Sequence, residues 1–151
     1  MHRGIAQIKN MRLYIISLTN NLTTEQMNNI PNGFGNNIIW NVAHLLASQQ
    51  RMCYMRSGNK FFVDESLVLK YKIETKPENT AGTEEITEIK KQFIASIDQL
   101  EDDYNKKIFE TYTTWTTPYG VTISSIEDVI KFLPFHEGLH TGTILALQKF
   151  V

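Results

Sequence analysis

The sequence contains a single cysteine and no long apolar run, and its positive and negative charges nearly cancel. With only Cys53 available, the chain cannot form an internal disulfide. No apolar run reaches the length of about 18 residues that a membrane helix needs, so we expect no membrane span. The amino-terminal stretch MHRGIAQIKNMRLYIISL has no small-residue cleavage site, so we expect no signal peptide. Together these absences favour a cytoplasmic protein.

The formal net charge of −1 leaves no basic surplus to neutralise phosphates, so we expect no nucleic-acid partner. Hydrophobic residues make up 42% of the 151 residues and charged residues 21%, which is typical of a globular protein. This length suffices for one domain with its own core. We therefore expect a single globular domain over residues 1–151.

Four segments carry apolar residues at three- and four-residue intervals, the period of an amphipathic helix. We expect helices at about 8–22, 37–56, 86–104 and 125–151. In the first, the predicted buried stripe includes Ile8, Met11 and Ile15. The 86–104 segment gives the cleanest stripe, which consists of Ile86, Ile89, Phe93, Ile97, Leu100 and Tyr104.

Polar residues that can cap a helix precede three of these segments. Asn36 or Asn37 can begin the second helix, Thr83 the third, and Ser124 or Ser125 the fourth. Two longer connections, 58–82 and 105–124, link the predicted helices. The second is rich in β-prone and aromatic residues, and we expect it to form either a short hairpin or a loop packed on the bundle. This order predicts an all-α four-helix bundle.

Histidines give the chain its candidate chemistry. His136 and His140 stand four residues apart in the stretch HEGLH, so they share one face of the last predicted helix. Both fall on or beside its apolar stripe, which predicts that they are buried, with either a metal ion or hydrogen bonds as partners. His44 lies off the main stripe of the second helix and, taken alone, is better explained as a packed or partly exposed histidine than as a ligand. His2 lies at the terminus, where we expect fraying.

The HExxH pattern is also found in zinc proteases, but here it lacks the usual third ligand. Residues 141–151 contain no histidine, cysteine, aspartate or glutamate. A third ligand would have to come from upstream, and the well-placed histidine there is His44. We therefore do not expect a protease.

The stretch NNIIWNVAHLLASQQRMCYMRSG resembles the second helix of the DinB/YfiT-like superfamily. The stretch YGVTISSIEDVIKFLPFHEGLHTGTILALQKF is similar to its last helix and the connection entering it, and LTTEQMNNIPNGFGNNIIWNVAHL to its link between helices one and two. The similarity covers nearly the whole chain. The pairs Trp40 with His44 and His136 with His140, followed by Gly142, make it specific.

The resemblance implies a four-helix bundle with a long crossover between helices two and three. It implies that His44, His136 and His140 bind one divalent metal ion. It also implies a homodimer and, in some relatives, thiol S-transfer with bacillithiol or mycothiol. Many relatives have glutamine where this chain has Thr143, which leaves the substrate contacts open.

A site with three imidazole ligands and an open position is the usual layout of a catalytic metal centre. Imidazole suits zinc, nickel, iron or copper, so the sequence does not identify the ion. We expect a small-molecule substrate, with a low-molecular-weight thiol as a candidate co-substrate. Glu137 is a candidate general base or a partner that orients an imidazole; equally, it is a packed or exposed glutamate.

Three functions remain open: a metal-dependent transferase or hydrolase, a non-catalytic metal- or ligand-binding stress protein, and a structural dimer with a vestigial site. The intact set of histidines weighs against the third. Cys53 lies about 13 Å along the helix from His44 and is predicted to be a buried structural thiol. Pro134 is predicted to kink the last helix. The aromatic residues that can line a pocket mouth or pack in the core are Trp115, Tyr119, Phe34 and Trp40.

Overall fold

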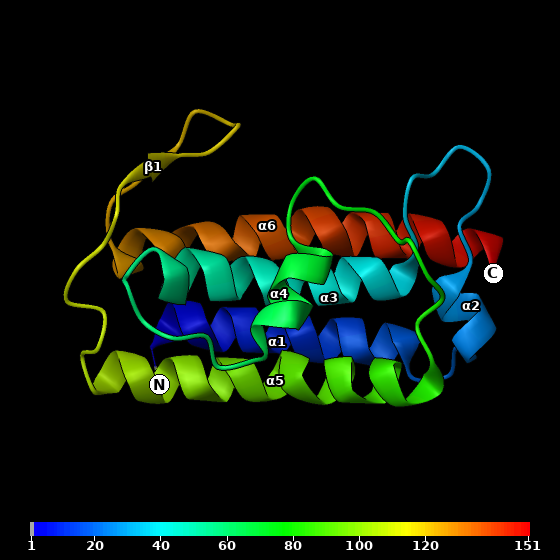
Figure 1. The fold of residues 1–151 in the computed structure, drawn as a ribbon, viewed down its shortest axis with the longest axis horizontal. Helices are drawn as coiled ribbons and strands as arrows, with labels where there is room; N and C mark the ends of the chain where they lie inside the picture. The colour runs from blue at the N-terminus through cyan, green and yellow to red at the C-terminus, as the bar shows by residue number, and fades with distance from the viewer. Residues whose placement is uncertain (1) are drawn as a thin grey trace.

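The protein, described over residues 2–151 by a computed structural model, is built from helices and a small hairpin (Figure 1). The expected all-α fold is confirmed. In chain order, the elements are α1 (Arg3–Thr19), α2 (Thr24–Asn28), α3 (Ile38–Gln50), the π-helical turn η1 (Arg51–Met55), α4 (Glu65–Tyr71), α5 (Thr83–Asn105), β1 (Trp115–Thr116), β2 (Thr122–Ile123), α6 (Ile126–Leu147) and the 3₁₀ turn η2 (Gln148–Phe150).

The long helices α1, α3, α5 and α6 lie side by side around a common interior (Figure 1). Helix α1 contacts α5 and α6, and α3 also contacts both. The chain runs in one direction through α1 and α6 and in the opposite direction through α3 and α5. Because α3 and α5 run the same way, the segment between them must return along the bundle, and it carries α4.

Two of the predicted helix caps are confirmed, and one is wrong. The Asn37 side chain accepts a hydrogen bond from the Trp40 amide, and the Ser125 hydroxyl accepts one from the Asp128 amide. Thr83 is the first residue of helix α5 rather than its cap, and Gly82 stands at the cap position; the Thr83 hydroxyl instead bonds that of Thr24. The expectation of a frayed His2 is also wrong, because its imidazole accepts a hydrogen bond from the Gly4 amide and caps α1.

The buried stripe of α1 differs from the predicted one. Ile8 and Ile15 face the core as expected, but Arg12 is fully buried while Met11 is only partly so. Arg12 can lie in the interior because its guanidinium is bound on several sides, as described below. The stripe of α5 follows the prediction from Ile86 to Leu100.

Every residue of α3 is buried, including its polar ones. One side of α3 packs on α5 and α6, while the crossover helix α4 covers another side. This second cover explains why His44, which lies off the main apolar stripe, is nonetheless buried. The α-helix expected to reach residue 56 ends at Gln50 and continues as the wider turn η1, in which the Arg56 amide bonds the Arg51 carbonyl.

The 105–124 connection contains a hairpin, so the first of the two alternatives holds. Trp115 pairs with Ile123 and Thr116 with Thr122 in antiparallel register. The hairpin rises above α6 near one end of the bundle (Figure 1). Helix α6 runs continuously through Pro134.

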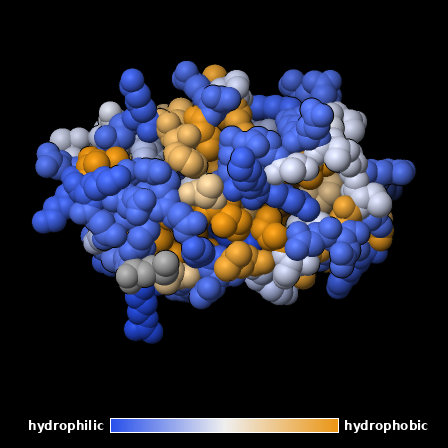
Figure 2. Space-filling view, turned by 90° about the horizontal axis from the view of Figure 1, so that it is seen from below, coloured by the Kyte–Doolittle hydropathy of each residue, from blue (hydrophilic) through white to orange (hydrophobic). Residues whose placement is uncertain are grey.

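Hydrophilic side chains cover most of the face shown in Figure 2, and hydrophobic ones gather near its middle. Within residues 2–151, no helix combines the length and the apolar character that crossing a membrane requires.

Candidate metal centre

Helices α3 and α6 bring the predicted histidines together. His44 lies on α3, and His136 and His140 lie one turn apart on α6. One ring nitrogen from each lies within 4.8 Å of the other two. The ring centroid of His140 lies 4.7 Å from that of His44 and 4.7 Å from that of His136. Residues 92 positions apart in the chain thus form one compact cluster.

Asn41 fixes the orientation of His140. The Asn41 amide nitrogen donates to Asn36 Oδ1 at 2.9 Å and to the Asn37 carbonyl at 2.8 Å. Its carbonyl oxygen Oδ1 therefore faces His140 and lies 2.8 Å from Nδ1. Since this oxygen only accepts, Nδ1 carries the proton, and the Nε2 lone pair of His140 is available to a cation.

His44 is held in the same tautomer by the crossover. Its Nδ1 donates to the Tyr71 carbonyl at 2.8 Å, at the end of α4. Its Nε2 accepts from the Ser48 hydroxyl at 3.2 Å, one turn further along α3. Trp40 stacks on the His44 ring with centroids 4.6 Å apart and planes 11° apart. Helix α4 therefore both buries His44 and supplies the acceptor that orients it.

His136 lacks such a partner. Its Nδ1 is buried and makes no hydrogen bond within residues 2–151. The Phe132 ring packs against it, with centroids 6.3 Å apart and planes 23° apart. A buried ring nitrogen without a partner is unfavourable, and a cation bound by Nδ1 itself would remove that deficit.

The surroundings keep all three imidazoles neutral at pH 7. Burial, together with the neighbouring His140, His44 and Arg12, lowers the pKa of His136 to about 3. Burial and His44 lower the pKa of His140 to about 4. Burial also lowers the pKa of His44, although its bond to the Tyr71 carbonyl acts in the opposite direction. A metal ion would therefore displace no proton from these nitrogens at neutral pH.

The cluster fits a divalent metal ion. Nitrogens bound to one tetrahedral ion at 2.0–2.1 Å lie about 3.4 Å apart, so small side-chain rotations suffice from the present spacing. His44 and His140 keep Nδ1 bonded to an oxygen, as in protein metal sites, which makes Nε2 the ligand atom of each. An ion at His44 would take the place of the Ser48 hydroxyl, which now donates to that Nε2. Within the described chain, this is the group of histidine, cysteine and acidic residues that could hold such an ion.

The sequence profile of the DinB superfamily matches residues 7–144, which include every element from within α1 to most of α6. The chain belongs to the DinB superfamily. Its resemblance to that family, first seen in the histidine-bearing segments, is confirmed. A comparison with curated proteins gives no match.

In this DinB-superfamily chain, Glu137 faces away from open solvent and pairs with Arg12. Its Oε1 accepts from Arg12 Nε at 2.9 Å and lies 2.8 Å from Nη2, and both side chains are 0% exposed. Arg12 Nη1 also donates to the Phe93 carbonyl and to the Ser96 hydroxyl. Glu137 thus belongs to a buried network joining α1, α5 and α6, which matches the packed alternative for this residue.

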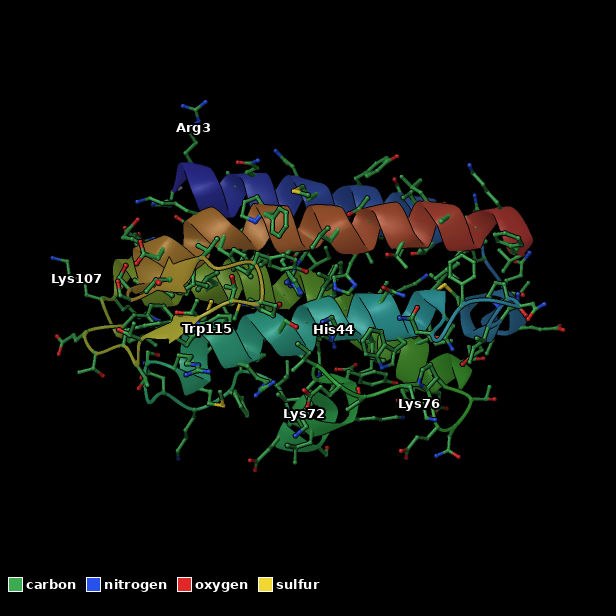
Figure 3. The ribbon with its side chains drawn as sticks, turned by 90° about the horizontal axis from the view of Figure 1, so that it is seen from above. Arg3, His44, Lys72, Lys76, Lys107 and Trp115 are labelled. Carbon is green, nitrogen blue, oxygen red and sulfur yellow. The ribbon has the colours of Figure 1, made fainter. Side chains whose placement is uncertain are left out.

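A cavity of about 190 Å³ opens beside the histidines. His44, Ser48 and His136 form part of its wall, and the hairpin covers another side. Of the aromatic candidates, Trp115 and Tyr119 line this cavity; Figure 3 labels Trp115 on the hairpin and His44 on α3. Trp40 stacks on His44, and Phe34 packs on the core and on Phe150.

Several residues of this site could not be found by sequence reasoning. Asn41 and Ser48 are polar residues on a fully buried helix, and a polar residue at such a position indicates a hydrogen-bond partner of a buried group. The role of Tyr71 depends on its backbone carbonyl, so no side-chain pattern could indicate it. Cys53 is buried, as predicted, and burial raises the pKa of its thiol to about 12.

Proposed function

We propose that this protein binds one divalent metal ion through His44, His136 and His140 and acts on a small molecule in the adjoining cavity. The observation that carries the proposal is the convergence of three neutral imidazoles, of which those of His44 and His136 line a cavity. A closed structural site would not need access from a cavity, whereas a catalytic one does. The whole chain acts, in this proposal, as one metal-binding helical domain.

Bound there, a divalent ion would supply Lewis acidity, lowering the pKa of a water or thiol. The chain's own residues prepare the site for it. Asn41 and the Tyr71 carbonyl hold the protons of His140 and His44 away from the ion. The Ser48 hydroxyl lies at the cavity wall beside His44, where it can donate a hydrogen bond to a substrate atom. Trp115 and Phe132 reduce the access of bulk water.

We favour a thiol S-transferase or hydrolase over a non-catalytic stress protein that only binds metal or ligand. The discriminating observation is the access of added thiol to the ion. In cobalt-substituted protein, an S-transferase gives a visible-spectrum change when small thiols are added, because sulfur enters the cobalt coordination. An unchanged spectrum across a thiol panel would contradict transfer and leave hydrolysis or simple binding.

Metal binding is tested by dialysis at pH 7 followed by elemental analysis. Wild-type protein should retain about one ion per chain, as a three-histidine site predicts. The variants His44→Ala, His136→Ala and His140→Ala should each lose it. His2→Ala is the matched control, because this histidine caps α1 and should leave the metal content unchanged. Equal metal content in the His44→Ala variant and the wild type would contradict the proposal.

Glu137 as a general base stays a prediction, and its contacts favour a positioning role instead. Its Oε1 is bound by Arg12, so the carboxylate anchors the turn of α6 that carries His136 and His140. The variant Glu137→Gln separates the two roles. If Glu137 is a general base, the variant should lose turnover but keep its metal binding and stability. If Glu137 is an anchor, metal affinity and stability should decrease together.

Two further expectations belong to the same proposal. A cytoplasmic location fits a chain whose single cysteine is buried and unpaired. We also propose a homodimer through the outer surface of α1 and α6, where Tyr14 and Leu145 are 49% and 38% exposed. Light scattering after gel filtration should give twice the chain mass for the wild type and a single chain mass for Tyr14→Glu/Leu145→Glu. A wild-type monomer would contradict the dimer.

A further inference from the structure

The cavity beside the histidines has a cationic wall. Arg51 and Arg56, from η1 and the residue after it, both line it. Within residues 2–151, no aspartate or glutamate lines the same cavity. Arg51 also lies close enough to His44 to contribute to lowering its pKa. Positive charge therefore gathers where a substrate would lie.

The guanidinium groups of these two arginines have no polar partner within residues 2–151. In the described part of the chain, neither guanidinium forms an ion pair or a hydrogen bond, and Arg56 only stacks over the Trp115 ring at 5.1 Å. Arg12 shows the opposite case, because its three nitrogens all have oxygen partners. Arg12 is a structural arginine, whereas Arg51 and Arg56 retain their donors for another molecule.

The π-helical turn places both arginines at the same cavity. Residues five apart on an α-helix point about 140° away from each other. In η1 the Arg56 amide instead bonds the Arg51 carbonyl at 3.2 Å, and this wider turn brings the two residues closer to one face. π-helical turns occur frequently at functional sites. Here the turn lets Arg51, Met52, Met55 and Arg56 all line one cavity.

The remaining wall of the cavity is largely apolar. Met52, Phe132 and Trp115 line its inner part. At the rim, Ile73 and Tyr119 are 52% and 57% exposed, so their apolar surface is accessible to a molecule in the cavity. The cavity thus offers an apolar surface between a cationic wall and the histidines.

We propose that the substrate is a small molecule with an apolar body and an oxyanion, a carboxylate or a phosphate, which Arg51 and Arg56 bind while the apolar body packs against the hairpin. Guanidinium groups bind such oxyanions through paired, charge-assisted hydrogen bonds. This inference rests on the proposed function for its chemistry, because it assigns the substrate of the same site.

The test compares three probes that share a phenyl group and an alkyl chain: 4-phenylbutanoate, 3-phenylpropyl phosphate and the neutral 4-phenylbutanamide. Isothermal titration calorimetry measures their binding to the full chain, both metal-free after EDTA treatment and reconstituted with zinc. Arg51→Gln, Arg56→Gln and the double variant remove the proposed contacts. Arg3→Gln is the matched control. Arg3 is exposed and lies far from Trp115 and His44 (Figure 3), so this substitution removes the same charge without changing the cavity.

At least one anionic probe should bind metal-free wild-type protein about tenfold or more tightly than the amide, as hydrogen bonds to charged groups predict. The double variant should lose this preference, and Arg3→Gln should keep it. Whichever anion binds more tightly identifies the substrate as a carboxylate or a phosphate. Equal binding of all three probes to the wild type, or a preference that survives in the double variant, would overturn the proposal. Whether the protein binds metal is measured separately, from the zinc content of the reconstituted sample. A protein that binds no zinc would contradict the proposed function but would not affect the comparison of probes on metal-free protein.

Discussion

The tautomers of His44 and His140 each depend on a single hydrogen-bond acceptor. For His140 that acceptor is Asn41 Oδ1, whose amide is fixed by Asn36 and the Asn37 carbonyl. The contact is made by one side chain, so it can be removed without changing any of the three histidines.

The variant Asn41→Ala should weaken metal binding by roughly 10- to 100-fold, as losses of partners that orient metal ligands usually do. The imidazole loses both its orientation and the oxygen that increases its basicity. Competition with a chromogenic chelator measures the affinity. Asn41→Asp is the rescue variant, since a carboxylate also accepts from Nδ1 and should restore tight binding. Unchanged affinity in Asn41→Ala would show that Asn41 does not orient the ligand.

The pH dependence of stability follows from the same residues. The folded chain lowers the pKa of His136 to about 3 and that of His140 to about 4. In the unfolded chain each has a pKa near 6.5. As the pH falls below about 6.5, the unfolded state takes up protons that the folded state does not, so the free energy of unfolding must decrease.

For metal-free protein, this decrease should amount to roughly 2–3 kcal/mol between about pH 7.5 and 5.5 for the two histidines together. Urea unfolding at a series of pH values measures it. The double variant His136→Gln/His140→Gln removes both groups and should give a much flatter profile over this range. A variant profile as steep as that of the wild type would assign the pH dependence to other residues.

At the scale of the elements, two ion pairs link α1 to its neighbours, and they should differ greatly in energy. Arg12 and Glu137 join α1 to α6 with no exposure to solvent. Lys9 and Asp98 join α1 to α5 at the surface, where Asp98 is 55% exposed. The surface pair is therefore a matched control for the buried one.

Replacing Glu137 by leucine leaves Arg12 buried without its counter-ion and should cost about 3–5 kcal/mol in the free energy of unfolding. Asp98→Ala should cost at most about 1 kcal/mol. The double variant Arg12→Met/Glu137→Leu should be more stable than Glu137→Leu, because no unpaired charge remains. Urea unfolding compares all four proteins. A Glu137→Leu variant as stable as Asp98→Ala would contradict the interpretation of the pair as an anchor.

The sequence predicted the elements best where local periodicity decides the structure. The stripe from Ile86 to Leu100 and the caps Asn37 and Ser125 follow the local pattern, so they were predicted correctly. Arg12 was missed because a buried arginine is tolerated only with a carboxylate 125 positions away, and no local pattern links the two. The turn η1 was likewise missed.

At the scale of the whole molecule, the candidate metal site depends on the crossover. Helix α4 covers α3 and supplies the carbonyl that orients His44. Sequence reasoning identified His136 and His140 from their spacing, but it needed the family resemblance to include His44. The spacing of a pair on one helix is local information, whereas the burial of His44 depends on how the segment 58–82 folds back.

The cavity also could not be predicted from the sequence, because it depends on how distant segments pack together. Its wall combines η1, the hairpin and α6, which are far apart in the chain. The aromatic content of 105–124 suggested a pocket mouth, and Trp115 and Tyr119 do lie there. Arg51 and Arg56 showed no distinguishing local pattern.

The central claim is that His44, His136 and His140 bind one metal ion, and X-ray diffraction across several metal absorption edges tests it most directly. Crystals of protein purified without added metal should show one anomalous peak per chain, about 2.0–2.2 Å from a ring nitrogen of each histidine. The edge at which the peak appears identifies the element. A map with no peak between these three side chains, from crystals that retain the fold, would contradict the account.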